Sequence, residues 1–458
     1  MTATEIEGRS YLRLVGLGAL IGLPAALLAA AFIALVHELE DALWPDKPAW
    51  YLVIGLPIVG AAICAFARGA LPVDGGHPPL EGIGGGATPL AYAPGIALAA
   101  IGTLAFGAVL GPEAPLIALG SVTGVALARI VRIDEKGEKV LASAGSFAAI
   151  SALFDGPLVA GMLLVEGGLA MGSSLLGALL PGLVAAALGY VLFVGLGDWG
   201  GLDAASLSVP GLPDYVGTHV LDLGLAVVVG VAAAAAIFAI RELATRIEGA
   251  KLPMTALLLA GGAATGLLAA LAEALGADPK DVLFSGQTAV PHVVAESSAG
   301  IVLVLLAAKG LGYAVCLGCG FRGGPVFPAV FLGVAIAMLP VIAFDVSPTW
   351  AAAVGTAGGM AAGTQLLFAP VLLGALLVGH VGLDAIPAAV LASAAAWLTV
   401  STLDSRWGGD KRYVFVRHDF RRYGATLHAV PPPDVRDLDR RSPHGPRLGL
   451  LSACGELP

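Results

Sequence analysis

The chain has 458 residues, of which 57% are hydrophobic and 64 are glycine. Together these make up about 70% of the chain, whereas soluble domains typically reach about 45–50%. Charged residues account for 12%, the net charge is −9 and the mean hydropathy is +0.89. Such values exclude a disordered chain, a disulfide scaffold and an ordinary cytosolic enzyme, and the negative charge excludes a nucleic-acid binder, which phosphates would repel. The sequence therefore predicts a polytopic membrane protein.

Apolar stretches long enough to cross a bilayer recur along the chain. We predict spanning helices, all α, at about 13–36, 51–66, 95–110, 174–197, 218–240, 254–275, 299–318 and 385–401. The regions 111–170 and 324–382 are also apolar, but glycine and proline divide them into pieces of roughly 10–18 residues. Pieces of this length are typical of re-entrant or broken helices, which lie at membrane depth only inside protein or beside a water-filled cavity.

The distribution of lysine and arginine predicts the orientation, because these residues gather on cytoplasmic loops. Basic residues cluster at 129–139 and 241–251, and the segment from 404 onward holds ten of the 24 in the chain. The segments 38–49 and 198–216 are instead predominantly acidic. We therefore expect both termini to be cytoplasmic.

An internal repeat divides the membrane portion. Gly111–Gly120 (GPEAPLIALG) aligns without a gap with Gly324–Gly333 (GPVFPAVFLG), and the same offset of 213 residues holds over some 55 residues. The basic loop 129–139 has no basic counterpart in the second copy, which favours inverted repeats. The predicted order is a cytoplasmic segment 1–12, a first repeat 13–216, a second repeat 217–403 and a short cytoplasmic tail 404–458 without a regulatory domain.

The two aligned segments predict an anion site. Gly-Pro before a helix-compatible run is typical of a helix N-terminus, and inverted repeats that meet at broken helices place such N-termini around an anion at the membrane midplane. Glu113 is the one charged residue between Glu81 and Arg129, and an intramembrane carboxylate indicates function by default. Ionised, it would compete with an anion; protonated, it would leave the site. The alternative is a helix cap bound to backbone N–H groups.

Four segments in order resemble a known family. They are Gly111–Pro115 (GPEAP), Phe154–Leu158 (FDGPL) followed by Glu166, Lys309 followed by Gly320–Pro328 (GFRGGPVFP), and Phe368–Pro370 (FAP). These are similar to the GxExP, FNAPL-to-glutamate, K-to-GxxGGxFxP and RAPxxG motifs of the CLC family of chloride channels and proton-coupled chloride exchangers. The chain is identified as a divergent prokaryotic-type member of that family.

The resemblance implies a CLC-like all-α inverted-repeat fold and a homodimer, multi-pass in the plasma (inner) membrane, with a pore in each subunit. It also implies site residues. Glu113 is expected to gate, with Glu166 taking part in gating and proton transfer. The expected anion-binding residues are Gly75, Gly76, His77, Gly111, Pro112, Ala114, Val326 and Phe327.

Departures from the family motifs bear on mechanism. Gly76 stands where the family has an anion-contacting serine, which leaves backbone N–H groups or His77 as donors. Val326 takes the phenylalanine position of GxFxP. Gly167 takes the place of the second glutamate, the internal proton relay, and its absence favours a channel over an exchanger. Lys309 either supplies positive potential near the inner mouth or snorkels at a helix end.

The predicted function is transport of chloride, gated by Glu113, as a channel (voltage-gated members are included in the family) or as a proton-coupled antiporter. Fluoride or another anion is the alternative ligand, because the serine is lost. A non-transporting sensor or scaffold is the alternative of another class. The spans contain no HExxH, paired-aspartate run or Ser/His pairing, so we expect no enzyme, metal or cofactor. The expected partners are the anion, protons in an exchanger, the lipid bilayer and a second copy of the chain.

Overall fold

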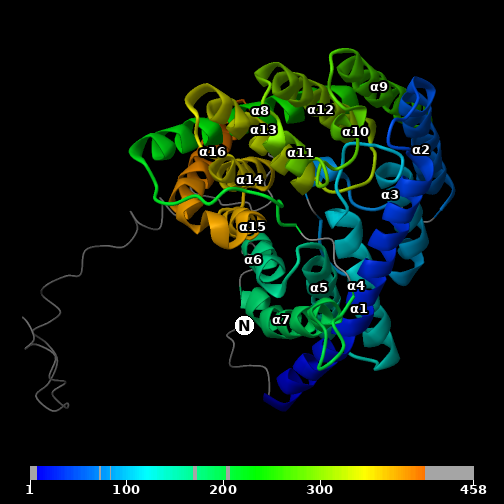
Figure 1. Cartoon of the computed structure of the whole chain (residues 1–458). Coiled ribbons are helices and arrows are strands. Elements are labelled where there is room, and N and C mark those ends of the chain that lie inside the picture. Colours follow the sequence, from blue (N-terminus) through cyan, green and yellow to red (C-terminus); the bar gives the residue numbers. More distant parts are fainter. Residues whose placement is uncertain (1–7, 72–73, 83, 169–172, 203–206, 408–458) are drawn as a thin grey trace, which may run out of the picture. The chain divides into compact units, whose positions relative to one another are not determined.

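The computed structural model describes residues 8–71, 74–82, 84–168, 173–202 and 207–407. Residues 1–7 of the predicted N-terminal segment and 408–458 of the predicted tail therefore lie outside the described residues. The helices, labelled in Figure 1 where there is room, are α1 (Gly8–Leu43), α2 (Trp50–Ala70), η2 (Pro79–Glu81), η3 (Leu90–Tyr92), α3 (Ala93–Leu104), α4 (Glu113–Ile130), α5 (Glu135–Leu153), α6 (Pro157–Gly168), α7 (Ser173–Val194), α8 (Val220–Glu248), α9 (Met254–Ala274), α10 (Pro279–Val282), α11 (Val290–Ala295), α12 (Ala299–Cys319), α13 (Val326–Phe344), α14 (Pro348–Thr364), α15 (Phe368–Val378), η5 (Gly379–Ala385) and α16 (Ile386–Trp407). Within these ranges, strand pairing is confined to two isolated bridges.

Most predicted spans are present as helices close to their predicted ranges. The prediction at 95–110 is wrong, because α3 has 12 residues and ends at Leu104, which is too short to cross a bilayer. The indole N–H of Trp44 donates to the carbonyl of Ala105 at 3.0 Å. The chain then turns at Gly107, whose φ of +87° lies in the left-handed region that glycine tolerates. The next residues lead in extended form to the start of α4.

Glycine and proline divide the two broken regions as predicted. The first consists of α4, α5 and α6 and the second of α13, α14 and α15. Three pairs of helices begin 213 residues apart: α4 and α13 at Glu113 and Val326, α5 and α14 at Glu135 and Pro348, and α7 and α16 at Ser173 and Ile386. The offset read from the sequence is therefore also the offset of the helical pattern.

Small residues bring corresponding helices into close contact in both halves. α4 packs against α5, and α13 packs against α14. A Cβ atom added at Gly145 of α5 would lie 2.0 Å from the carbonyl oxygen of Gly120 in α4. In the second half, a Cβ at Gly333 of α13 would lie 2.1 Å from the carbonyl oxygen of Gly355 in α14. Such approach of two helix backbones is typical of membrane interfaces built on glycine and alanine.

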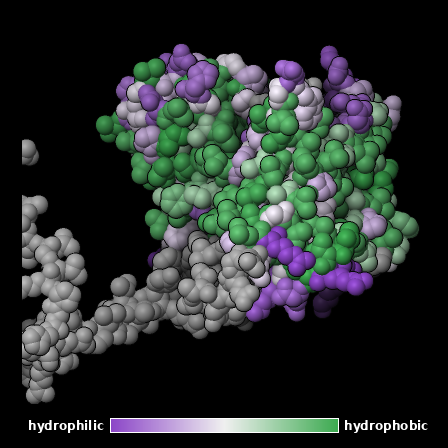
Figure 2. Space-filling model, turned by 90° about the horizontal axis from the view of Figure 1, so that it is seen from below, coloured by the Kyte–Doolittle hydropathy of each residue, from purple (hydrophilic) through white to green (hydrophobic). Residues whose placement is uncertain are grey.

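The surface fits a bilayer. Nine helices in the described part of the chain are long and apolar enough to cross a membrane. Figure 2 shows hydrophobic residues across the middle of one face and hydrophilic residues toward its margins. The chain is an integral membrane protein of the all-α class.

We expect Gly145→Ala to destabilise the α4–α5 contact, because the added methyl meets backbone that has little room to yield. Overpacking of this kind costs about 1–3 kcal/mol. The matched control is Gly55→Ala in α2, where a Cβ meets nothing within 4 Å. Thermal unfolding of the detergent-solubilised protein, followed by circular dichroism, should give a lower midpoint for Gly145→Ala only. Equal midpoints for the two variants would contradict the close contact.

Candidate functional site

The starts of α4 and α13 are joined by an antiparallel bridge between Gly111 and Gly324. The N–H of Gly111 donates to the carbonyl of Gly324 at 2.8 Å, and the N–H of Gly324 donates to the carbonyl of Gly111 at 2.5 Å. Because the paired segments run in opposite directions, the two halves meet in inverted orientation. The two helix N-termini that the sequence predicted to face one another are thus brought together.

The carboxylate of Glu113 lies at this junction. Its Oε1 accepts a hydrogen bond from the N–H of Phe327, in the first turn of α13, at 2.9 Å. The residue has no exposed surface, and Oε2 is buried without a hydrogen-bond partner among the described residues. A helix N-terminus favours negative charge and presents free N–H groups. Glu113, the first residue of α4, therefore places its carboxylate at the N-terminus of α13.

The two bridging glycines leave the space that this carboxylate fills. A Cβ at Gly324 would lie 1.6 Å from Oε2 of Glu113, and a Cβ at Gly111 would lie 2.3 Å from the same atom. No side chain therefore fits at either position while the carboxylate occupies its place. The GPEAP and GPVFP segments need glycine at their first position for this reason as well as for the bridge.

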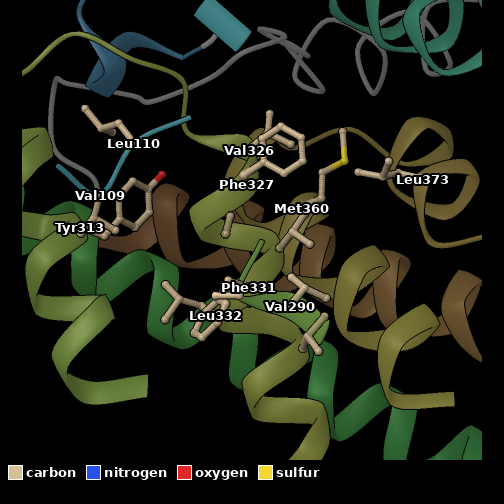
Figure 3. Close-up of a cluster of buried hydrophobic side chains, with 14 of the residues drawn as sticks. Val109, Leu110, Val290, Tyr313, Val326, Phe327, Phe331, Leu332, Met360 and Leu373 are labelled. Atoms are coloured by element: carbon tan, nitrogen blue, oxygen red, sulfur yellow. The ribbon is translucent and has the colours of Figure 1, made fainter. Parts of the chain in front are cut away.

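Apolar groups surround the carboxylate. Val326 and Phe327 are buried, with 0% and 3% exposure, and belong to the hydrophobic cluster in Figure 3. The ring of Phe327 stacks on that of Phe154 with centroids 5.6 Å apart. The hydroxyl of Tyr313 donates to the carbonyl of Pro325, directly before α13, at 3.1 Å. Ala114 is buried beside Glu113. These contacts keep the start of α13 dry and fixed.

A cavity of about 170 Å³ reaches this site. It is lined by Pro112, the residue before Glu113, and its polar lining comes from His37 and Glu40 of α1 together with Ser285 and Gln287. Glu40 belongs to the predominantly acidic segment 38–49. The cavity therefore connects that end of α1 with the start of α4.

Glu166 lies at a different helix start. Its Oε1 accepts from the N–H groups of Leu367 and Phe368 at 2.9 and 2.8 Å, and its Oε2 accepts from the N–H of Ala369 at 2.7 Å. Both oxygens are thus used by the N-terminus of α15, whereas Glu113 bonds α13. The structure does not bring the two glutamates onto the same helix start. The arrangement of Glu166 is that of a capping carboxylate.

The predicted loop Gly75–His77 is built on left-handed backbone, with φ of +67° at Gly75 and +103° at Gly76. The Nε2 atom of His77 is buried and has no hydrogen-bond partner within the described part of the chain. Burial lowers the pKa of His77 despite the opposing effect of Glu81. The ring is therefore neutral near pH 7 and offers a donor or an acceptor, not a positive charge.

Three charged residues that the sequence analysis did not select hold this loop. Asp74 forms ion pairs with Arg68 at 2.7 Å and with Arg322 at 2.5 Å. Arg322 precedes Gly323 and Gly324, so these pairs tie the loop to the start of α13. A signal was available for Arg322, which is the one charged residue between Lys309 and Asp345, as Glu113 is between Glu81 and Arg129.

Lys309 lies inside the protein and binds main-chain carbonyl groups there. It is completely buried, so it does not snorkel, and that prediction is wrong. Its Nζ donates to four consecutive carbonyls, those of residues 281–284, at 2.8–3.3 Å. It also lies 4.7 Å from the ring centroid of Phe331. These contacts close the connection after α10 onto α12 and α13.

Inverted halves that bring half-helix N-termini together on a buried carboxylate define the class of this molecule as a membrane anion transporter. The sequence model of the family described as "Voltage gated chloride channel" matches residues 79–401. The chain belongs to this family, the CLC family of anion channels and antiporters.

Relatives and solved structures agree with this assignment. The chain is 30% identical over 340 residues to the "Putative ion-transport protein YfeO" of Escherichia coli (strain SMS-3-5 / SECEC), covering 70% of this chain and 77% of that protein. The same figures hold for the protein of that name from Escherichia fergusonii. In fold, the chain is similar to a slow cyanobacterial Cl⁻/H⁺ antiporter, with a TM-score of 0.69, 17% identity and coverage of 91% of this chain and 99% of that one. A CLC-type fluoride/proton antiporter gives a TM-score of 0.63 at 21% identity, covering 86% of this chain and 96% of that one.

We expect Glu166→Ala to lower the thermal midpoint, because three N–H groups at the start of α15 lose their acceptor. Loss of such a cap costs about 1–2 kcal/mol. Glu273→Ala, at an exposed position near the end of α9, is the matched control and should change the midpoint little. An unchanged midpoint for Glu166→Ala, combined with altered proton movement in a flux assay, would instead assign this residue to proton transfer.

Proposed function

We propose that the chain transports a small anion, chloride in the first place, with Glu113 as the gate. The observation that carries this proposal is the hydrogen bond from the Phe327 N–H to the Glu113 carboxylate, which is the contact an anion would make at the start of α13. An ionised carboxylate there stands in for the anion and closes the site. A protonated carboxyl group competes more weakly with the anion and leaves the site at the start of α13.

Backbone groups would replace the water shell of the anion. The candidate donors are the N–H groups of Ala114 in the first half and of Val326 and Phe327 in the second. Gly111, whose N–H is used in the bridge, and Pro112, which has none, would contribute geometry. The loop Gly75–His77 would contribute backbone N–H groups of its own. Its lost serine removes one hydroxyl, so fluoride or another anion is a second candidate ligand.

Two mechanisms use the same gate. In a passive channel, Glu113 only opens and closes the path. In a proton-coupled exchanger, Glu113 also carries the proton. Full use of both Glu166 oxygens at the start of α15, together with Gly167 beside it, favours the channel. The cavity lined by Pro112, the residue before Glu113, supports the exchanger, because protons would need a polar path toward that residue.

We propose further that the protein works as a homodimer in the plasma (inner) membrane, with both termini cytoplasmic and without enzymatic activity. Membership of the family supports the dimer. The basic loops 129–139 and 241–251 support the orientation, since positive residues remain on the cytoplasmic side. A sensor or scaffold that transports nothing is the remaining alternative, and it rests on the altered Gly75–His77 and Val326–Phe327 segments.

We expect Glu113→Gln to remove the pH dependence of anion flux. In the unaltered protein, flux should rise as the pH falls, because protonation weakens the competitor at the start of α13. The glutamine variant has no group to titrate there and should conduct at a nearly constant rate. The measurement is chloride and fluoride efflux from proteoliposomes with external pH recorded, and Glu273→Gln is the matched control.

Each result separates the alternatives. Chloride flux that drives protons uphill, and stops doing so in Glu113→Gln, identifies an exchanger. Flux without proton movement identifies a channel. Flux of fluoride alone transfers the proposal to that ion. Absence of flux of either anion from well-folded protein overturns transport and leaves the scaffold.

A further inference from the structure

Two arginines from distant parts of the chain converge on one carboxylate. Arg68, in the last turn of α2, donates through Nε and Nη2 to the two carboxylate oxygens of Asp74 at 2.7 and 2.8 Å. Arg322, between α12 and α13, donates through Nη2 to the same carboxylate and through Nε to the main-chain carbonyl of Asp74 at 2.8 Å. The Arg68 guanidinium is therefore arranged as a fork on both oxygens of a planar oxyanion, and Arg322 adds a single N–H to the same group.

The three partners differ in exposure. The side chain of Arg322 is 5% exposed and that of Arg68 is 11% exposed, whereas that of Asp74 is 57% exposed. Arg68 is also fixed from behind, since its Nη1 donates to the carbonyl of Gly320 at 2.6 Å. The positive groups thus belong to the protein interior and the negative group faces outward. Two buried cations share one carboxylate, so the cluster keeps a net positive charge.

The cluster lies beside the proposed anion path. A Cβ at Gly75 would be 2.9 Å from Cγ of Arg68 and 3.3 Å from Cγ of Arg322, so both side chains pack directly on this loop. Gly76 follows, where the family's serine is missing. On the other side, Arg322 is two residues from Gly324, which pairs with Gly111. Positive charge is therefore present at the place where a neutral hydroxyl has been lost.

We propose that Arg68 and Arg322 form a second anion-binding site, in which the Asp74 carboxylate occupies the ligand position until a transported anion displaces it. The proposal rests on the proposed transport function. Because guanidinium forks match two coplanar oxygens, the ligand class is a small planar monovalent oxyanion, with nitrate and formate as representatives, in preference to a spherical halide.

Protonation would not open this site near neutral pH. Burial alone would raise the pKa of Asp74, but the hydrogen bonds and charges of Arg68 and Arg322 outweigh it and hold the pKa below its usual range. The carboxyl group of Asp74 therefore stays ionised at pH 7. It loses its negative charge only when the pH falls well into the acid range. What displaces it must be another anion.

The test is nitrate and chloride binding to the purified protein by isothermal titration calorimetry, with a bulky organic anion as the background electrolyte. Asp74→Ala removes the internal competitor and should tighten nitrate binding about tenfold, because nitrate no longer has to displace a carboxylate held by charge-assisted hydrogen bonds. Arg322→Gln should abolish the gain when combined with Asp74→Ala. Arg68→Lys keeps the charge without the fork and should lose nitrate affinity while retaining chloride affinity. Arg246→Gln, in an exposed ion pair of α8, is the control.

An Asp74→Ala variant that melts at lower temperature and binds nitrate no more tightly would overturn the proposal and make the cluster a structural ion pair. An equal gain for chloride would overturn the selection of planar oxyanions. If Arg322→Gln does not fold, Arg68→Gln tests the same cluster by removing its fork. Binding is measured without transport, so intact nitrate binding in a protein that shows no flux would count against the proposed function and leave this site standing.

Discussion

The antiparallel pairing of Gly111 with Gly324 is the contact on which the rest of the structure depends. It requires the chain before α4 to be extended, which explains why α3 ends at Leu104 and does not continue as a span. It also sets two helix N-termini beside each other at a point where neither Gly111 nor Gly324 can carry a side chain. The space so created is filled by Glu113, whose backbone starts one helix while its carboxylate bonds the other. Bridge, glycines and acid are therefore one unit, and a change in any of them changes the others.

The buried charges differ in how completely they are bonded. Lys309 has four carbonyl acceptors and an aromatic ring, and both oxygens of Glu166 have N–H donors. Glu113 has one donor for Oε1 and none among the described residues for Oε2. A fully bonded buried charge resists displacement, because every bond would have to be replaced in a medium without water. A half-bonded one can exchange its place with a ligand at lower cost. This difference in bonding is what the proposed gating role of Glu113 rests on, and Glu166 lacks it.

The features that depend on neighbouring residues could be predicted from the sequence. Glycine and proline mark where helices stop, so the broken regions and the offset of 213 residues could be predicted, and the isolation of Glu113 made it a candidate. Contacts between residues far apart in sequence could not be read in this way. Asp74 and Arg322 are 248 residues apart, and nothing near either one indicates the other. Of the two expectations for Lys309, snorkelling failed for the same reason, since the acceptors of its Nζ are main-chain carbonyls that any sequence provides. Isolation nevertheless points to Arg322 by the criterion that selected Glu113.

The two repeats are related by symmetry in backbone and differ in chemistry. The offset that places α4 on α13 sets Val326 opposite Glu113 and Phe327 opposite Ala114. If both copies carried an acid, two carboxylates would face each other across the Gly111–Gly324 pair, and like charges at such short range cannot both remain ionised. With valine in the second copy, one half provides the carboxylate and the other provides N–H donors that receive it. The proposed gate therefore depends on the loss of symmetry at this single position, which makes one of two equivalent helix starts a carboxylate and the other its binding site.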